Sequence, residues 1–317
     1  MSFSSGIKEE LSRQYSTARH CRIAEIAAMI NISGIIEYDE SLSKFGIKVH
    51  TENPAVARKY FTLLKKTFNI KVDVVMRRSQ HLKKKRVYNV YVLKKEEVLK
   101  VLQACHLYEN GKIYNQIDPL IVGTTCCKRS YIRGAFLASG SMSEPDKTYH
   151  LEMVDSHESH SRQLMHLVNH FEMDAKIIIR KKYHVVYLKE GEQIVEFLNV
   201  IEAHTALMEL ENLRIIKEMR NNVNRMVNCE TANLNKTVSA AVRQIIDITY
   251  IEETVGLDKL SEPLEDLAKL RLEHSEASLL ELGKMLSPQV GKSGVNHRLR
   301  KINEYAEQLR DKREDLS

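Results

Sequence analysis

The sequence predicts an α+β protein in which a duplicated αββαββα unit, arranged about a pseudo-twofold axis, is followed by an all-α domain. Two patterns predict this fold: an internal repeat in the first two thirds of the chain, and two amphipathic helices joined by a turn near its end. From Gly191 to Gly256 the chain has no other glycine and no proline, which favours helix. We place the boundary at the polar stretch 220–225, so that the domains cover residues 1–220 and 225–310.

The repeat rests on four pairs of similar segments that occur in the same order in each half. The segment IAAMINISG (Ile26–Gly34) is similar to IRGAFLASG (Ile132–Gly140), 106 residues later. The other pairs are Leu63-Leu64 with Leu167-Val168, Val72–Arg78 with Ala175–Lys181, and Tyr88–Glu97 with Tyr183–Glu192. Each repeat therefore reads helix, two strands, helix, two strands, helix, over about 20–105 and 126–205. The alternative is chance similarity of two α/β segments, which four anchors in one order argue against.

Small side chains lie along one face of both repeated helices. They are Ala27, Ala28 and Gly34 in the first, and Gly134, Ala135, Ala138 and Gly140 in the second. Because small side chains let two helices approach closely, we expect these helices to pair at the pseudo-twofold axis. The glycine that closes each segment is predicted to end its helix in the left-handed conformation.

On these residues the first domain resembles the LAGLIDADG homing endonucleases, whose nine-residue motif aligns with both segments. The resemblance covers about residues 1–205 and implies a paired-helix fold over a saddle of strands that lies in the DNA major groove. It also implies an acid at the eighth motif position of each helix, which holds the catalytic divalent metal. Here these positions are Ser33 and Ser139, and neutral hydroxyls are poor ligands for a hard cation. We therefore expect the fold without the nuclease: no catalytic residue, no metal and no cofactor.

Basic side chains cluster on the last two predicted strands of each repeat and on an insertion, residues 79–86, in the first. The candidate phosphate contacts are Arg77, Arg78, Lys83, Lys84, Lys85, Arg86, Arg180 and Lys181. Phosphate contact is the functional interpretation, and a solvated basic face is the alternative. DNA, a protein and a ligand all remain open as occupants of this strand surface.

The segment 278–306 has the pattern of a helix-turn-helix. Ser278 and Glu281 form a capping box, Ser287-Pro288 ends the first helix, and Ser293 is expected to cap the second. The second helix has one apolar face, made of Val295, Leu299, Ile302 and Ala306. Its polar residues, which in this motif read DNA, are Lys292, Ser293, Asn296, His297, Arg298, Arg300 and Lys301.

Together the two domains resemble the WhiA family of bacterial regulators, which joins a degenerate LAGLIDADG-like domain to a C-terminal helix-turn-helix. The resemblance is carried by Asn228–Ala241, Ser287–Ile302 and the pair Arg133-Gly134. It implies a cytoplasmic, nucleoid-associated protein that binds double-stranded DNA and regulates transcription. In this family the role is in sporulation in actinobacteria, and in cell division and chromosome segregation in Firmicutes. Regulatory or division proteins are further candidate partners.

Composition excludes several other classes of protein. We expect no signal peptide and no membrane span, because no apolar segment is long enough. The five cysteines include no CxxC, which argues against a zinc ribbon and a disulfide framework and is compatible with a reducing cytoplasm. The net charge of +6 is a weak indication of a polyanionic partner.

Two clusters of reactive side chains have plain interpretations. The segment 157–170 contains four histidines: His157, His160, His166 and His170. Because they lie opposite the apolar face of a predicted helix, we expect solvated surface residues and no metal site. We expect Cys126 and Cys127 to be small packed residues without a redox role.

Three functional hypotheses follow. The favoured one is a non-enzymatic DNA-binding regulator, supported by the outward Asn296, His297 and Arg300. The second, an active metal-dependent endonuclease, is disfavoured by Ser33 and Ser139. The third is a protein-interaction scaffold that uses the basic strand surface. The sequence makes no prediction of the DNA target, the sign of regulation or the oligomeric state.

Overall fold

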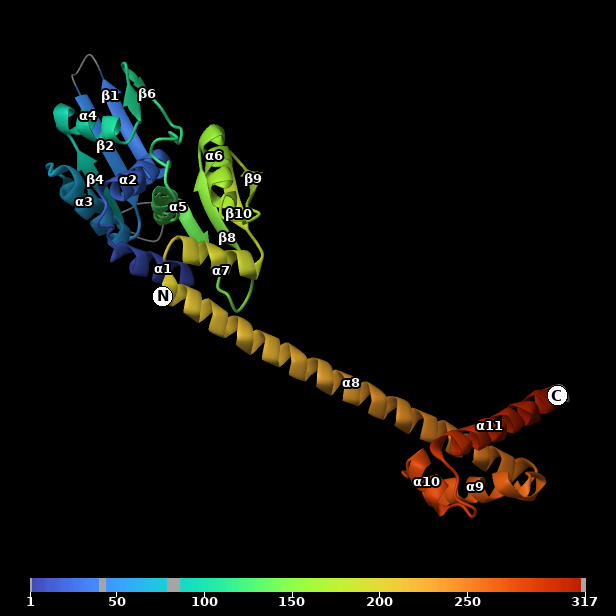
Figure 1. The fold of residues 1–317 in the computed structure, drawn as a ribbon. Helices are drawn as coiled ribbons and strands as arrows, with labels where there is room; N and C mark the ends of the chain where they lie inside the picture. The colour runs from blue at the N-terminus through green and yellow to red at the C-terminus, as the bar shows by residue number, and fades with distance from the viewer. Residues whose placement is uncertain (1, 40–43, 79–85, 315–317) are drawn as a thin grey trace. The chain divides into compact units, whose positions relative to one another are not determined.

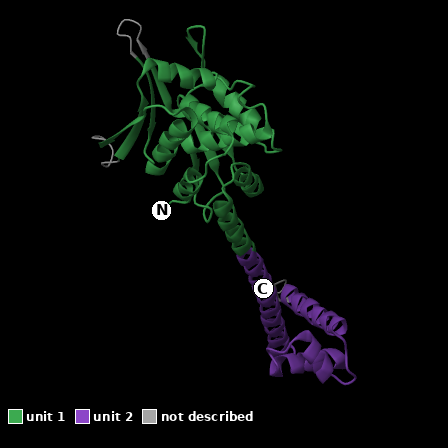
Figure 2. Cartoon of the chain, turned by 60° about the vertical axis from the view of Figure 1, so that its left-hand side comes forward, with its two compact units in different colours: residues 1–218 green, residues 219–317 purple. Residues whose placement is uncertain are grey.

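The computed structural model describes residues 2–39, 44–78 and 86–314. The chain forms two compact units, residues 1–218 and 219–317, which Figure 2 shows in green and purple. One helix, α8 (His204–Thr254), begins in the first unit and ends in the second, so the polar stretch 220–225 is helical. Most of the inserted loop, residues 79–85 with Lys83, Lys84 and Lys85, lies outside the described residues.

Unit 1 contains the αββαββα unit twice. The first copy consists of α2 (Arg19–Ser33), β1 (Gly34–Asp39), β2 (Lys44–Thr51), α3 (Pro54–Phe68), β3 (Asp73–Arg78), β4 (Arg86–Val92) and α4 (Lys95–Ala104). The second consists of α5 (Thr125–Ser139), β7 (Gly140–Met142), β8 (Leu151–Asp155), α6 (Glu158–Asn169), β9 (Lys176–Arg180), β10 (Tyr183–Leu188) and α7 (Gly191–Val200). The predicted duplication is confirmed.

Each copy folds its strands into an antiparallel sheet of the same order, β1-β2-β4-β3 and β7-β8-β10-β9. Alternation along the strands decides which face is buried. Ile47 and Val49 of β2 are buried and pair with Val92 and Val90 of β4, whereas Lys48 lies on the opposite face. The alternation thus places apolar side chains of the sheet in the core of unit 1.

The motif helices α2 and α5 lie side by side in the middle of unit 1 (Figure 1). A Cβ atom at Gly134 would lie 2.5 Å from the carbonyl oxygen of Glu25 and 3.0 Å from the Cβ of Ala28. The two backbones therefore approach as closely as the small residues predict, and a larger side chain at Gly134 would push them apart.

The glycines that close the motif helices are not left-handed. Gly34 has φ −84° and ψ 142°, and Gly140 has φ −65° and ψ 145°, so each helix passes directly into a strand through extended backbone. Glycine is needed at both positions because there is no room for a side chain. A Cβ atom at Gly34 would lie 2.3 Å from the Ile30 carbonyl oxygen, and a Cβ atom at Gly140 would lie 2.3 Å from a Phe136 ring carbon. The predicted left-handed helix ends were wrong, because the chain continues into β1 and β7 without reversing.

The rest of unit 1 frames the duplicated core. Helix α1 (Phe3–Ser12), which the sequence analysis did not predict, buries Ile7 and Leu11 against it. A small hairpin, β5 (Tyr108–Glu109) and β6 (Lys112–Ile113), lies in the connection between the two copies.

Unit 2 is all-α, as predicted. It contains the later part of α8, a short 3-10 helix (Leu257–Lys259), α9 (Glu262–Glu273), α10 (Leu279–Met285) and α11 (Lys292–Glu314). Its separate core is built mainly from Ile248, Ile251, Leu267, Leu282, Val295, Leu299 and Ile302. Within the described ranges, no helix combines the length and apolar composition that crossing a membrane requires.

Candidate nucleic-acid interface

Helix α11 has two distinct faces, as its sequence period predicts. Val295, Leu299, Ile302 and Ala306 are buried in the core of unit 2. The exposed positions near its start are Lys292, Ser293, Asn296, His297, Arg300 and Lys301. Apolar packing on one side therefore holds a row of hydrogen-bond donors in solvent on the other, at the helix end that reads base edges in helix-turn-helix proteins.

Arg298 departs from this arrangement. It is half-buried, and its Nη1 donates to the carbonyl oxygen of Pro263, 3.5 Å away. Its side chain is therefore directed toward the start of α9. We expect Arg298 to support the position of α11 more than to contact DNA.

The turn before α11 is set by local contacts. Ser278 and Glu281 form the predicted capping box, in which the Ser278 backbone N–H donates to the Glu281 carboxylate over 2.8 Å. The α10 helix stops before Ser287-Pro288, as expected. Ser293 does not cap α11: the helix already begins at Lys292, and the Val295 N–H donates to the Gly291 carbonyl. The predicted cap was wrong by two residues, because Gly291 takes this position and glycine can serve as a cap without a side chain.

The exposed face of α11 borders a hollow of about 560 Å³ in unit 2. Asn296 and Arg300 line it from α11, and Lys236 and Arg243, both exposed, line it from α8. The buried Asp247 carboxylate at its inner side is held by Asn303 (2.6 Å) and Arg310 (2.7 Å), so its charge is compensated within the unit. The lining of the hollow therefore has three basic side chains, Lys236, Arg243 and Arg300, against one further acid, Glu307.

A second basic surface lies at the ends of strands in the first copy of unit 1. Arg77 and Arg78 close β3, Arg86 opens β4, and all three are exposed. The register places Arg78 directly opposite Arg86. Like charges in opposed strand positions destabilise a sheet, so a bound anion would stabilise this end of the hairpin.

The equivalent end of the second copy is less available to an anion. Arg180 donates from Nη1 to the Glu152 carboxylate on β8 over 3.1 Å, so a phosphate would have to compete with an existing ion pair. Lys181 is exposed in the β9–β10 turn, with a left-handed φ of 58°. Of the two basic predictions for this copy, only Lys181 has no carboxylate partner among the contacts of the described residues.

Apolar side chains are exposed beside these basic residues. Val74 and Met76 on β3 are 47% and 49% exposed, and Ile178 and Ile179 on β9 are 48% and 66% exposed. Both strands are at the edge of their sheets. Exposed apolar edges of this kind are more typical of a contact with protein than of a contact with phosphate.

The two motif serines offer no metal chemistry. Ser33 is buried, and its hydroxyl donates to the Met29 carbonyl oxygen over 2.9 Å, which is an ordinary bond within the helix. The Ser139 hydroxyl is buried without a hydrogen-bond partner among the described residues. Both hydroxyls are neutral and buried, so they do not supply the negative charge that a divalent cation needs.

The histidines of α6 do not all lie on its surface. His157, His166 and His170 are exposed, as predicted, but His160 is fully buried. Its ring lies against the carboxylate of Asp155, and its Nε2 is 2.7 Å from the Tyr131 hydroxyl. The surface prediction for His160 was wrong because it sits near the start of α6, where the helix packs against β8 and α5.

A buried polar chain therefore crosses unit 1 from β8 to α2. The Asp155 carboxylate can only accept, so His160 Nδ1 donates to it and Nε2 accepts from the Tyr131 hydroxyl. Asn31 then donates to the Tyr131 oxygen over 2.9 Å. Burial raises the pKa of Tyr131 strongly, so this hydroxyl keeps its proton.

A second buried group links α2, α3 and α5. The Glu25 carboxylate is fully buried between Lys59 Nζ at 2.6 Å and Arg133 Nε at 3.3 Å. Lys59 also donates to the carbonyl oxygens of Leu11 and Gln14, both at 2.8 Å. Burial lowers the pKa of Lys59, and the charge of Glu25 acts against that shift.

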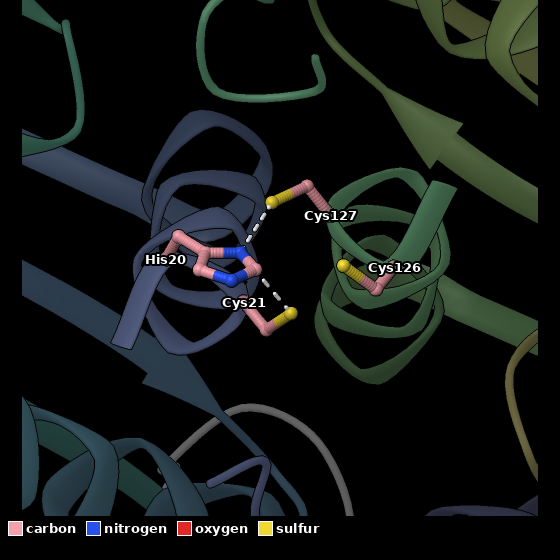
Figure 3. A group of neighbouring side chains, drawn as sticks. All are labelled: His20, Cys21, Cys126 and Cys127. Atoms are coloured by element: carbon pink, nitrogen blue, oxygen red, sulfur yellow. Dashed lines mark hydrogen bonds between the residues drawn. The ribbon is translucent and has the colours of Figure 1, made fainter. Parts of the chain in front are cut away.

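The prediction that Cys126 and Cys127 are packed residues holds for only one of the two. Cys127 is buried, but Cys126 is exposed. Both lie beside His20 and Cys21 at the start of α2 (Figure 3).

Family comparisons cover both units. The family model of the WhiA N-terminal LAGLIDADG-like domain matches residues 19–108, that of the WhiA LAGLIDADG-like domain matches 128–220, and that of the WhiA C-terminal HTH domain matches 223–306. A "Probable cell division protein WhiA" of Lachnoclostridium phytofermentans is 52% identical over 314 residues, which cover 98% of this chain and all of the relative. One of the same name from Alkaliphilus oremlandii is 50% identical, over 98% of each chain.

The chain belongs to the WhiA family. The resemblance stated on the sequence is thereby confirmed. The full-length DUF199/WhiA crystal structure from Thermatoga maritima has the same architecture, with a TM-score of 0.61 and 28% identity over 97% of this chain and 99% of that one. A crystal structure of the N-terminal LAGLIDADG domain of DUF199/WhiA matches 63% of this chain and 90% of that one, with a TM-score of 0.50 and 23% identity.

Sequence reasoning missed several polar residues of this WhiA chain. Lys236 and Arg243 lie about two helical turns apart on α8, and only the packing of α8 beside α11 places them in the lining of the hollow. Glu25 and Lys59 were missed because one charged residue in a helix does not produce a repeating pattern in the sequence that would indicate its burial. His20 and Cys21 were missed too, although they stand 106 residues before Cys126 and Cys127, the spacing of the repeat itself.

Proposed function

We propose that this WhiA-family chain is a non-enzymatic protein of the cytoplasm that binds double-stranded DNA at the nucleoid. On this proposal it regulates transcription and acts in cell division and chromosome segregation. The helix-turn-helix match supports DNA binding, and the names of the relatives support a role in cell division.

The exposed polar row at the start of α11 carries this proposal. Asn296 and Arg300 can form bidentate hydrogen bonds with adenine and guanine edges respectively. Lys292 and Lys301 extend the basic character of the same exposed surface, and Lys236 on α8 adds a candidate phosphate contact.

The first prediction separates base reading from folding within α11. Arg300→Ala should weaken binding to the preferred duplex by about 1–3 kcal/mol, because a possible bidentate contact to guanine is lost, and leave the melting temperature unchanged. Leu299→Ala should instead destabilise unit 2 by about 2–5 kcal/mol, because it opens a cavity in the core.

For each full-chain variant, two quantities are measured: the affinity for specific and random duplexes, and the melting temperature. Glu304→Ala, also exposed on α11 but one turn further from its start, is the control and should change neither. If Arg300→Ala binds both duplexes like the parent chain, α11 does not read DNA through this face.

A second candidate function, a protein-interaction scaffold, is favoured by one observation. The exposed apolar residues of β3 and β9 lie on the strands that would form the DNA saddle in the endonuclease fold. On this view unit 2 binds DNA while the saddle of unit 1 contacts a regulatory or division protein. Val75 on β3 is also exposed, at 41%. Val75→Ser with Ile179→Ser should then leave DNA affinity unchanged and weaken that protein contact.

The second prediction concerns catalysis. Incubation of the full chain with duplex DNA and Mg²⁺ or Mn²⁺ should leave the DNA uncut, because Ser33 and Ser139 cannot hold the ion. Gel analysis of plasmid DNA gives the readout. Cleavage that depends on the divalent ion and is abolished by Glu37→Gln would show a metal site rebuilt from strand β1.

A further inference from the structure

Two adjacent pairs of metal-binding side chains meet at one end of the motif helices. His20 and Cys21 lie in the first turn of α2, and Cys126 and Cys127 lie in the first turn of α5. The pairs are 106 residues apart, so they occupy equivalent positions of the two repeats and face each other across the helix pair (Figure 3).

We propose that His20, Cys21, Cys126 and Cys127 form a binding site for one thiophilic divalent cation, with Zn²⁺ as the ion that this donor set fits best. The three sulfur atoms and one imidazole nitrogen match a Cys₃His set, which is a common structural zinc set. The neutral serines at the other end of the same helices offer nothing comparable.

The distances fit a single ion. His20 Nδ1 is 3.0 Å from Cys127 Sγ and 3.5 Å from Cys21 Sγ, and all four donor atoms lie within 4.8 Å of one another. Around tetrahedral zinc, with Zn–S near 2.3 Å and Zn–N near 2.0 Å, two sulfurs are about 3.8 Å apart and a sulfur and a nitrogen about 3.5 Å. Shifts of about 1 Å or less would therefore place all four atoms around one ion.

Burial and charge also suit a bound cation. Cys21 and Cys127 are 3% and 4% exposed, whereas His20 and Cys126 are exposed, so the site has a protein-lined inner side and an open path for the ion. Three thiolates and one Zn²⁺ leave one net negative charge. That charge would lie at the N-terminal ends of two α-helices, where the backbone dipoles favour it.

A disulfide is the competing use of these thiols, and the geometry favours the metal. A bond between one cysteine of each helix would use two sulfurs and leave the third sulfur and His20 without a role. A cation uses all four groups in one step and releases the protons of the three thiols to solvent. It would also tie the two repeats together at the end of the helix pair that lies opposite Ser33 and Ser139.

The test uses the reduced full chain with Co²⁺ as a spectroscopic probe and Zn²⁺ as competitor. We expect thiolate-to-cobalt charge-transfer absorption, tetrahedral ligand-field bands, a stoichiometry of one ion per chain, and displacement by Zn²⁺. Cys126→Ser should weaken binding by more than about 100-fold, since even loss of an outer-shell partner costs about 10–100-fold. It removes an exposed side chain, so the fold should remain.

Cys229→Ser is the matched control, because Cys229 is also exposed but lies in unit 2, away from the cluster. It should bind Co²⁺ like the parent chain. A second readout is thermal unfolding: saturating Zn²⁺ should raise the melting temperature of the parent chain and of Cys229→Ser, and not that of Cys126→Ser. DNA binding is not needed for either readout.

Two results would overturn the site. One is a parent chain without thiolate-to-cobalt absorption. The other is equal cobalt affinity in the parent chain and in Cys126→Ser, which would place the ion elsewhere. Loss of two free thiols in air, with a Cys21–Cys126 or Cys21–Cys127 crosslink by mass spectrometry and no metal uptake by the reduced chain, would assign the cluster to redox chemistry instead.

Discussion

At the scale of single residues, the core of unit 1 depends on buried polar groups whose partners come from distant elements. His160 joins Asp155 on β8 to Tyr131 on α5, and Asn31 on α2 completes the chain of hydrogen bonds. Removing one member of such a chain is costly, because it leaves the others desolvated without a partner. The stability of the helix pair should therefore be sensitive to polar residues as well as to apolar ones.

The third prediction is that His160→Ala lowers the free energy of unfolding of unit 1 by about 3 kcal/mol, because it removes the imidazole partner of the buried Asp155 carboxylate and leaves only the His157 backbone N–H as its donor. Urea denaturation of the full chain, followed by circular dichroism, measures the change. His166→Ala, exposed on the same helix, is the control and should change it by less than about 0.5 kcal/mol. Equal stability of the two variants would contradict the buried role of His160.

At the scale of elements, the close approach of α2 and α5 determines how the two repeats fit together. Gly134 lies where the backbones meet, and a Cβ atom there would be 2.5 Å from a carbonyl oxygen that cannot move without displacing α2. The pairing therefore depends on the absence of one methyl group. Gly6 in α1 is the opposite case, because a Cβ there would meet no atom within 4 Å.

The fourth prediction is that two glycine-to-alanine substitutions have opposite signs. Gly134→Ala should destabilise unit 1 by about 1–3 kcal/mol through overpacking. Gly6→Ala should stabilise it by about 0.5–1 kcal/mol, because alanine favours helix and the site has room. Denaturant unfolding of both full-chain variants checks this. A stabilising Gly134→Ala would mean that the helices can separate at little cost.

At the scale of the whole molecule, the two units carry different kinds of candidate contact. Unit 1 offers Arg78 and Arg86 at a strand end, which suit phosphates of any sequence. Unit 2 offers Arg300 on α11, which suits a base edge. Affinity and sequence preference should therefore be separable by mutation in the full chain.

The fifth prediction is that Arg78→Ser with Arg86→Ser flattens the slope of log K against log salt by about 1.8, at about 0.9 for each lost phosphate contact. The ratio of specific to random affinity should stay unchanged. Combining this variant with Arg300→Ala should add the two effects, since the sites share no partner. Lys65→Ser with Lys66→Ser, exposed on α3, is the charge-matched control. An unchanged slope in the arginine variant would favour the protein-scaffold function of unit 1.

The sequence alone determined the features that repeat or alternate. The 106-residue spacing predicted the duplication, the apolar period of α11 predicted its buried face, and Ser33 and Ser139 predicted the missing metal acids. Each of these features can be found by comparing residue types along the chain, and the apolar period of α11 follows from helix geometry that holds in any tertiary context.

Tertiary structure alone decided which distant side chains meet. The extended backbone at Gly34 follows from β1 starting at once, the burial of His160 follows from packing on β8 and α5, and the ion pair of Arg180 needs Glu152 from another strand. The cluster of His20 and Cys21 with Cys126 and Cys127 exists only because the helix pair joins segments that are far apart in the chain. Such contacts leave no periodic pattern in the sequence. The number of residues between two side chains does not fix the distance between them in space, which is set only when the core packs.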